Sequence, residues 1–240
     1  MGKSRLYLLV RLLLVVGLFL VVVAASHLSR RTPPVSGDVV TYAAPGVVID
    51  AGHGGYDGGA QWGGVMEKDI NLELTHQLRE VLLAAGYRVA LTRYGDYSLI
   101  EQYETSNPKK REDMARRLAV IEDNAPDLVI LIHCNAINSS LWSGGQTFYQ
   151  EGFDQGKLLA EDIQDYLGEF TDTQRQSSAL DLYLLRESEI IGSLVEAGFL
   201  SNPQERNLLQ QTVYQRRIAS ATWLGLDKYR MYPLGHRPDR

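Results

Sequence analysis

Residues 128–132 read LVILI, an uninterrupted apolar run that ends at His133. A short run of this kind is typical of a β-strand that is covered on both faces, as the strands of a parallel sheet are. Parallel strands need long crossover connections, which are usually helices. The stretch therefore predicts a sheet with helices packed against both of its faces.

Segments with strand character alternate with segments of helical periodicity on both sides of this run. The expected strands are 47–50, 88–93, 128–132, 145–150, 182–185 and 193–196, and the expected helices are 68–85, 110–123, 155–167 and 214–229. Strands that alternate with helices in this way indicate the α/β class. We expect a single three-layer domain in which a mostly parallel, twisted sheet carries helices on both faces.

The first 31 residues differ in composition from the rest of the chain. An apolar run of 14 residues, 12–25, lies between three basic residues before it and two after it. The run is short for a membrane-spanning helix, which needs about 20 residues, and it suits the apolar region of a secretory signal. We expect an exported protein, with a signal peptide or membrane anchor over 1–31, a linker over 32–45, one folded domain over 46–232 and a tail over 233–240.

The charge balance narrows the range of partners. Without residues 1–31 the chain has 19 basic and 29 acidic residues, a formal charge of −10. We therefore expect no nucleic-acid partner, because binding to phosphates requires a basic surface. The single cysteine, Cys134, excludes a disulfide framework within the chain.

Polar side chains with metal-binding or acid–base chemistry stand where three expected strands end. His53 follows strand 47–50, His133 follows strand 128–132, and Glu196 ends strand 193–196. In open α/β sheets, sites form outside the carboxyl ends of the strands. Glu67, at the start of the helix 68–85, is a fourth candidate.

Two histidines and one carboxylate suit Zn²⁺, which in catalytic sites takes three protein ligands and a water. We assign His53, Glu67 and His133 as metal ligands and Glu196 as the general base and acid. Each residue also has an ordinary explanation. Glu67 could be a carboxylate that the helix dipole favours, and Glu196 could pair with Arg93.

Seven glycines lie between positions 52 and 64. We expect them to let a bulky polymer approach the metal, and to allow the positive-φ turns that bring Glu67 back beside His53. Gly54 and Asn135 are expected to contact the substrate, because of their positions. Strand alternation turns Cys134 away from the face that His133 uses, so a catalytic thiol is not expected.

The motifs together resemble those of the zinc-dependent N-acetylmuramoyl-L-alanine amidases. They are VVIDAGHGGYDGGA (47–60), EKDINLELTHQLREVL (67–82), LTR (91–93), LVILIHCNA (128–136) and LVEAGFLSNPQE (194–205). The resemblance implies a catalytic domain over 46–232 that hydrolyses the amide between the lactyl group of muramic acid and L-alanine in peptidoglycan. It also implies Zn²⁺ as the cofactor, with ligands His53, Glu67 and His133 and the catalytic glutamate Glu196.

Within the family, WSGGQTFY (142–149) and the compact layout look most like the germination-specific amidase of spore-forming bacteria. This implies work on spore cortex, where muramic δ-lactam is made, and a location at the forespore envelope. Only 33 residues separate Arg93 from Asp127, so we expect no inserted helix over 97–117 that blocks the metal. Activity would then be controlled by expression or by an activating protein partner.

Two other functions remain open. The first is a zinc carboxypeptidase-like enzyme that acts on ordinary peptides. The second is a non-catalytic wall-binding protein that keeps a vestigial site.

Overall fold

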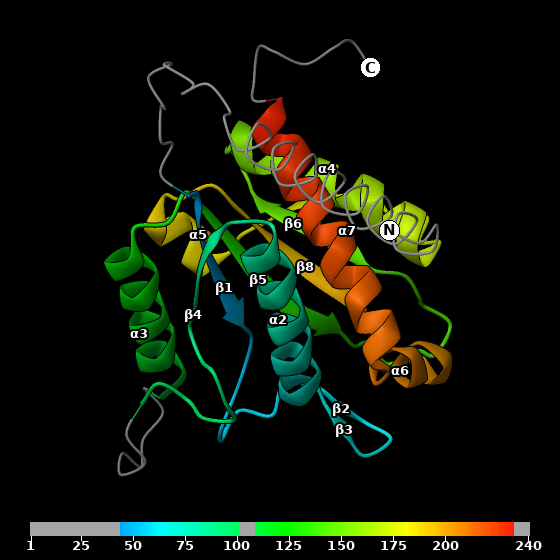
Figure 1. Cartoon of the computed structure of the whole chain (residues 1–240). Coiled ribbons are helices and arrows are strands. Elements are labelled where there is room, and N and C mark those ends of the chain that lie inside the picture. Colours follow the sequence, from blue (N-terminus) through cyan, green and yellow to red (C-terminus); the bar gives the residue numbers. More distant parts are fainter. Residues whose placement is uncertain (1–43, 101–108, 233–240) are drawn as a thin grey trace, which may run out of the picture. The chain divides into compact units, whose positions relative to one another are not determined.

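The computed structural model describes residues 44–100 and 109–232 (Figure 1). The expected leader, most of the linker and the tail lie outside the described residues, as do residues 101–108 of the segment expected to lack a plug. Among the described residues, no helix is both long enough and apolar enough to cross a membrane.

A six-stranded sheet forms the middle layer, as predicted. Four neighbouring strands are parallel, and the last two run in the opposite direction, because β6 is antiparallel to β8 and parallel to β7. The order across the sheet is β4 (Arg88–Leu91), β1 (Gly46–Ala51), β5 (Leu128–Asn135), β8 (Gly192–Phe199), β6 (Gln146–Gln150) and β7 (Ser178–Leu180). A separate two-stranded hairpin consists of β2 (Gln61–Trp62) and β3 (Val65–Met66).

Helices cover both faces of the sheet. One face packs against α2 (Glu67–Ala84), α4 (Asp154–Thr171) and α7 (Thr212–Met231), and α2 and α7 lie side by side in front of the strands (Figure 1). The other face packs against α3 (Lys109–Asn124) and α5 (Tyr183–Ser188). The short α6 (Pro203–Leu209) follows β8 directly. The predicted three-layer α/β architecture is confirmed.

Helix α2 shows how the pattern of apolar residues becomes structure. Ile70, Leu74, Leu78 and Leu82 recur every four residues and are all buried against the sheet and α7. The helix ends where expected, because Gly86 has a φ of +87° and donates its N–H to the carbonyl of Leu83. This is the left-handed position that glycine commonly takes just after a helix.

The prediction of a strand over 182–185 is wrong. These residues lead into α5, whose Leu184 and Leu185 are buried in the core under the second face of the sheet. An apolar run of four residues fits a strand or a buried helical turn equally well, so periodicity could not decide. Strand β7, the β2–β3 hairpin and helix α6 were not anticipated.

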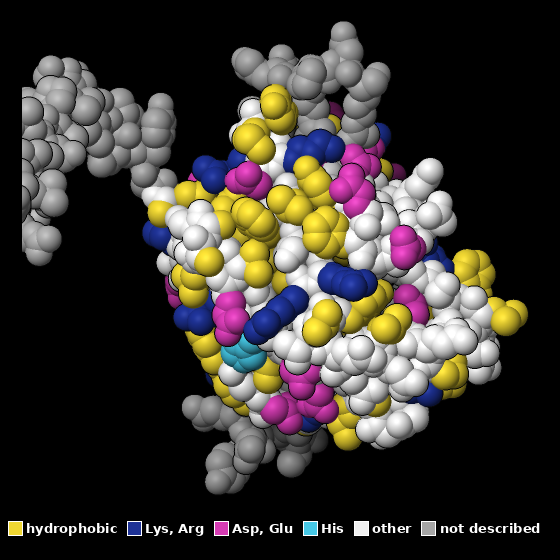
Figure 2. Space-filling model, turned by 45° about the vertical axis from the view of Figure 1, so that its right-hand side comes forward, with side chains coloured by type: hydrophobic (Ala, Val, Ile, Leu, Met, Phe, Trp, Pro, Cys, Tyr) yellow, Lys and Arg dark blue, Asp and Glu magenta, His cyan; other side chains and the backbone are white. Residues whose placement is uncertain are grey.

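Helix α6 did have a sequence signal. Asn202 accepts hydrogen bonds from the N–H groups of Gln204 and Glu205, and Pro203 occupies the first turn. An asparagine followed by proline is a common way to begin a helix. On the face drawn in Figure 2, basic, acidic and hydrophobic side chains are interspersed, and neither sign of charge forms a continuous area.

Two helical glycines give a test of the packing between α4 and α7. A Cβ on Gly225 would lie 2.4 Å from the Cα of Ile163, whereas a Cβ on Gly168 would meet its nearest atom at 3.5 Å. We expect Gly225→Ala to lower the free energy of unfolding by about 1–3 kcal/mol through overpacking. Gly168→Ala should be neutral or raise it by up to about 1 kcal/mol, because alanine favours helix more than glycine does. Urea denaturation measures both, and equal effects would contradict this account of the interface.

Candidate metal centre

Three side chains from distant parts of the chain meet at the carboxyl-terminal end of the parallel strands. His53 lies just after β1, Glu67 is the first residue of α2, and His133 lies near the end of β5. One nitrogen or oxygen from each side chain lies within 4.8 Å of the others. Within the described part of the chain, this is the one group of three or more side chains that could hold a metal ion.

The carboxylate of Glu67 lies between the two imidazole rings. Its Oε2 is 3.1 Å from Nε2 of His53, and its Oε1 is 2.9 Å from Nδ1 of His133. The two rings are 5.0 Å apart, centroid to centroid, and are nearly perpendicular, at 76°. Two imidazole nitrogens and a carboxylate oxygen thus converge on one small volume.

The electrostatics of this group favour a positive charge at its centre. Burial alone would raise the pKa of Glu67, but the contacts with His133 and His53 outweigh burial and hold it far below its ordinary value. Burial alone would lower the pKa of His53, but Glu67 and Asp57 raise it above its ordinary value. A bound cation would satisfy the same carboxylate, so the donor set and its charge fit a divalent metal.

Asp57 holds the other nitrogen of His53. Its Oδ2 is 2.9 Å from Nδ1 of His53, an ion-pair distance, although the angle is not that of a hydrogen bond. A carboxylate at the outer nitrogen fixes which imidazole nitrogen faces the cluster, as is common for histidines that bind metals. Sequence reasoning missed Asp57, whose position four residues after His53 in the glycine loop was the available signal.

Two glycines pack directly against the cluster. A Cβ on Gly52 would lie 2.2 Å from Nε2 of His133, and a Cβ on Gly59 would lie 2.6 Å from Oε2 of Glu67. Gly59 also has a φ of +65°, and beyond it Ala60 donates its N–H to Oε2 of Glu67. The glycines therefore make room for the side chains of the site itself, in addition to the turn that returns Glu67 to His53.

Two buried arginines hold the backbone that carries His53. Arg93 donates to the carbonyls of Ala51 and Gly52, at 2.8 and 3.1 Å. Arg117 donates to the carbonyls of Ala51 and His53, at 2.8 and 2.5 Å. His53 needs such support, because its φ of +63° lies in the left-handed region that is unfavourable for residues other than glycine. Arg93 thus contacts carbonyl groups, and the alternative of an ion pair with Glu196 is wrong.

The charge of Arg117 is balanced by two aspartates. Its Nη1 is 2.7 Å from Oδ1 of Asp50, and its Nε is 2.7 Å from Oδ2 of Asp113. Burial alone would raise the pKa of Asp50, but Arg117 and a hydrogen bond from Thr92 outweigh burial and hold it below its ordinary value. None of these supporting residues was identified from the sequence.

Glu196 lies beside the cluster, on the same face of the sheet as His133. The two residues are direct partners in the parallel pairing of β5 and β8. Its Oε2 is buried and has no hydrogen-bond partner in the described residues. Burial, with the negative charge of Glu67, raises the pKa of Glu196 to about 7, against the opposing effect of the two histidines. Glu196 can therefore gain and lose a proton near neutral pH.

A cavity of about 270 Å³ opens over these residues. His53, His133 and Glu196 line its polar part, and Leu180, Leu182 and other apolar side chains of α5 and α3 line the rest. A half-apolar cavity with a few converging polar groups is typical of a small-molecule or substrate site.

The remaining candidates lie as follows. The N–H of Gly54 donates to the carbonyl of Asp57, and Gly54 is buried against Tyr97, so its contact with substrate stays a prediction. Asn135 is half-buried, its carbonyl accepts from Leu200, and its role also stays a prediction. Cys134 is buried in the core on the opposite face from His133, as expected.

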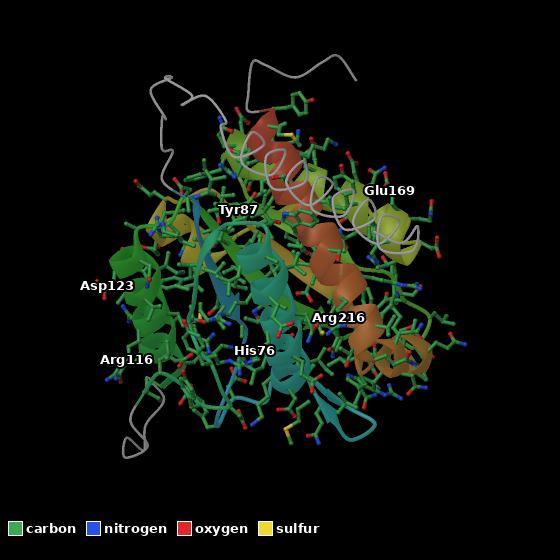
Figure 3. All side chains as sticks on the ribbon, viewed as in Figure 1. His76, Tyr87, Arg116, Asp123, Glu169 and Arg216 are labelled. Atoms are coloured by element: carbon green, nitrogen blue, oxygen red, sulfur yellow. The ribbon has the colours of Figure 1, made fainter. Side chains whose placement is uncertain are left out.

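The other described histidine has no part in this group. His76 lies partway along α2 and away from the strand ends (Figure 3).

Comparisons with known proteins agree with one another. Residues 47–228 match the family described as N-acetylmuramoyl-L-alanine amidase. The germination-specific N-acetylmuramoyl-L-alanine amidase of Bacillus subtilis is 37% identical over 199 residues, which cover 82% of this chain and 81% of that protein.

Solved structures show the same likeness. The CwlD amidase from Clostridioides difficile, determined in complex with the GerS lipoprotein, has a TM-score of 0.76 and 37% identity, over 78% of this chain and 98% of that one. An N-acetylmuramoyl-L-alanine amidase from Clostridium difficile 630 has a TM-score of 0.70 and 27% identity, over 80% of this chain and all of that one.

Substitution of the buried arginine tests the support of His53. We expect Arg117→Met to lower the free energy of unfolding by about 3–5 kcal/mol at pH 7, because it leaves Asp50 charged, buried and unpaired. Because the folded-state pKa of Asp50 is depressed, its stabilising effect is present above its unfolded value and is lost as the pH falls through the folded value. The difference between wild type and variant should therefore shrink below about pH 4.

Arg116→Met is the matched control. Arg116 is exposed and pairs with Glu112, so its loss should change the free energy of unfolding by no more than about 1 kcal/mol at either pH. Urea denaturation at pH 7 and at acid pH gives both numbers. An Arg117 effect that does not change with pH would show that Asp50 is not the partner that matters.

Proposed function

Since the chain belongs to the N-acetylmuramoyl-L-alanine amidase family and is an amidase of this kind, we propose that it works with a zinc ion held by His53, Glu67 and His133. The observation that carries the proposal is the convergence of these three side chains within 4.8 Å. Two imidazoles and one carboxylate form a common ligand set of catalytic zinc, and three protein ligands leave a position for water.

Zinc bound there would lower the pKa of a water to about 7 and polarise the carbonyl of the scissile amide. The protein's own acid–base group would be Glu196. Its buried carboxylate, which has no partner in the described residues, is free to accept the proton of the attacking water. The same carboxyl group then donates that proton to the L-alanine nitrogen as the amide bond breaks.

The substrate is peptidoglycan, and the bond is the amide between the lactyl group of muramic acid and L-alanine. The cavity beside Glu196 offers room and apolar surface for the groups that flank this amide. For the finer assignment, we propose spore cortex as the substrate and a role in δ-lactam formation and germination. This rests on the likeness to the germination-specific amidase of Bacillus subtilis.

The location and the partners are part of the same proposal. We place the protein outside the cytoplasm, at the forespore envelope, with residues 1–31 as a signal peptide or membrane anchor. The relative from Clostridioides difficile was determined in complex with a lipoprotein. That complex supports an activating protein partner for this chain as well.

Replacement of Glu196 tests the mechanism. We expect Glu196→Gln to keep one zinc ion per chain and to lower kcat by about 10²–10⁴-fold, because glutamine has the same shape and cannot transfer the proton. Release of new N-terminal alanine from spore cortex and from vegetative peptidoglycan measures the activity. Metal analysis measures the zinc.

The controls separate the rival functions. A chelator should abolish alanine release by the wild-type protein, and zinc should restore it. Release from free peptides in preference to muropeptides would favour a carboxypeptidase-like enzyme. Binding to peptidoglycan without hydrolysis, in the zinc-loaded wild type, would favour a wall-binding protein.

Glycine substitutions test the ligands without altering them. We expect Gly52→Ala to weaken zinc binding about 10–100-fold, because the new methyl group would displace the ring of His133. Gly58→Ala is the control from the same loop, because a Cβ there would meet its nearest atom, Sδ of Met66, at an ordinary 3.6 Å. Competition with a chromophoric chelator gives both affinities. Unchanged affinity in Gly52→Ala would exclude His133 as a ligand.

A further inference from the structure

An arginine and a tryptophan form a small exposed surface near the site, which we call the Arg175–Trp142 platform. The guanidinium of Arg175 lies over two aromatic rings, 4.5 Å from the centroid of Phe199 and 5.2 Å from that of Trp142. Phe199 is buried, whereas Trp142 is 53% exposed and its neighbour Leu141 is 89% exposed. Large apolar side chains that stay exposed on a folded surface commonly mark a binding site.

The platform is held in place by hydrogen bonds from several elements. Arg175 donates from Nε to the carbonyl of Ser143, at 2.8 Å, and from Nη1 to Oε1 of Gln146, at 3.0 Å. The side chain of Asn202 donates to the carbonyl of Trp142, at 3.2 Å. The buried carboxylate of Glu205 accepts from the N–H of Gly144, at 2.8 Å. The connection between β5 and β6 therefore presents Trp142 and Arg175 in a fixed arrangement.

The pairing of the strands places this platform next to the proposed catalytic residue. Gln146, the first residue of β6, is the direct partner of Glu196 in the antiparallel pairing with β8, and Glu196 is the direct partner of His133. Direct partners have their side chains on the same face of a sheet, about 5 Å apart. The side chains of His133, Glu196 and Gln146 thus form a row, and Arg175 contacts its far end.

Arg175 carries a positive charge that no carboxylate of the described residues balances by direct contact. No carboxylate oxygen in residues 44–100 and 109–232 lies within 4.0 Å of its guanidinium, and both printed hydrogen bonds go to neutral oxygens. The side chain is half-buried, and its Nη2 makes no hydrogen bond within that part of the chain. A planar guanidinium with donors to spare, in an acidic protein, is suited to a carboxylate ligand.

We propose that Arg175, supported by Trp142, determines specificity by binding a free carboxylate of the stem peptide on the L-alanine side of the scissile amide. This rests on the proposed function, because it requires the amide to lie at Glu196. The residue after L-alanine in the stem peptide is an acidic D-glutamate. One residue of extended peptide spans about 3.3–3.6 Å, so its carboxylate lies within reach of a group two strands away from His133.

Two substrates that differ in one charge test the proposal. They are muramoyl-L-alanyl-D-isoglutamate, with a free α-carboxylate, and the corresponding isoglutamine compound, in which this carboxylate is an amide. We expect wild type to have the lower KM for the acid. In Arg175→Gln the KM for the acid should rise roughly 10–100-fold, as for loss of a hydrogen bond to a charged group, with kcat within about twofold. The KM for the amide should stay unchanged, and Arg175→Lys should recover part of the preference.

Arg230→Gln is the matched control, because Arg230 also lies over an aromatic ring, that of Tyr87, and takes no part in the site. An equal rise of KM for both substrates in Arg175→Gln, or no rise for either, would overturn the proposal. A rise for both in Trp142→Ala with no effect of Arg175→Gln would do the same, and would assign the platform to an uncharged sugar.

A binding measurement keeps this test separate from that of the proposed function. Calorimetry with the two compounds on Glu196→Gln, with and without Arg175→Gln, needs no turnover. Tighter binding of the acid that disappears with Arg175 would support the proposal even if the wild type released no alanine, which would count against the proposed function alone. Equal binding of acid and amide would overturn the inference even in an active amidase.

Discussion

The contact between the carboxylate of Glu67 and the two imidazoles fixes how three parts of the chain meet. Glu67 begins α2, which packs on one face of the sheet, while the side chain of His133 emerges on the other face and His53 lies in the loop after β1. These elements can converge only if α2 starts close to the end of β5. The glycine loop makes this possible, because Gly52 and Gly59 leave no Cβ where the ring of His133 and the carboxylate of Glu67 must lie.

The loop that carries His53 cannot support itself. Its backbone turns through a left-handed residue, and its carbonyls point into the protein, away from any ladder of the sheet. Arg93 and Arg117 donate to these carbonyls, and both arginines are fully buried. A buried guanidinium is unfavourable unless it is fully hydrogen-bonded and its charge is balanced. For Arg117 the balance comes from Asp50 and Asp113, so the geometry of the site depends on a network behind it.

The sequence patterns predicted the layers better than the supporting contacts. Apolar runs and helical periodicity identified β1, β5, α2 and α7, because burial on a sheet imposes a strong pattern on long segments. The same reasoning failed at α5, where four apolar residues were too few to separate helix from strand. The motifs singled out His53, Glu67, His133 and Glu196, whose convergence the structure shows. Arg117, Asp57 and Arg175 were missed, because their contacts join residues far apart or lie within a loop that has no periodic pattern.

The central claim is that His53, Glu67 and His133 hold one zinc ion beside Glu196. A crystal structure of the zinc-loaded protein, with anomalous data collected on both sides of the zinc absorption edge, tests it most directly. The account predicts one strong zinc peak per chain, about 2.0–2.2 Å from a nitrogen of each histidine and from an oxygen of Glu67. A peak held by other residues, or no peak in fully loaded protein, would contradict it.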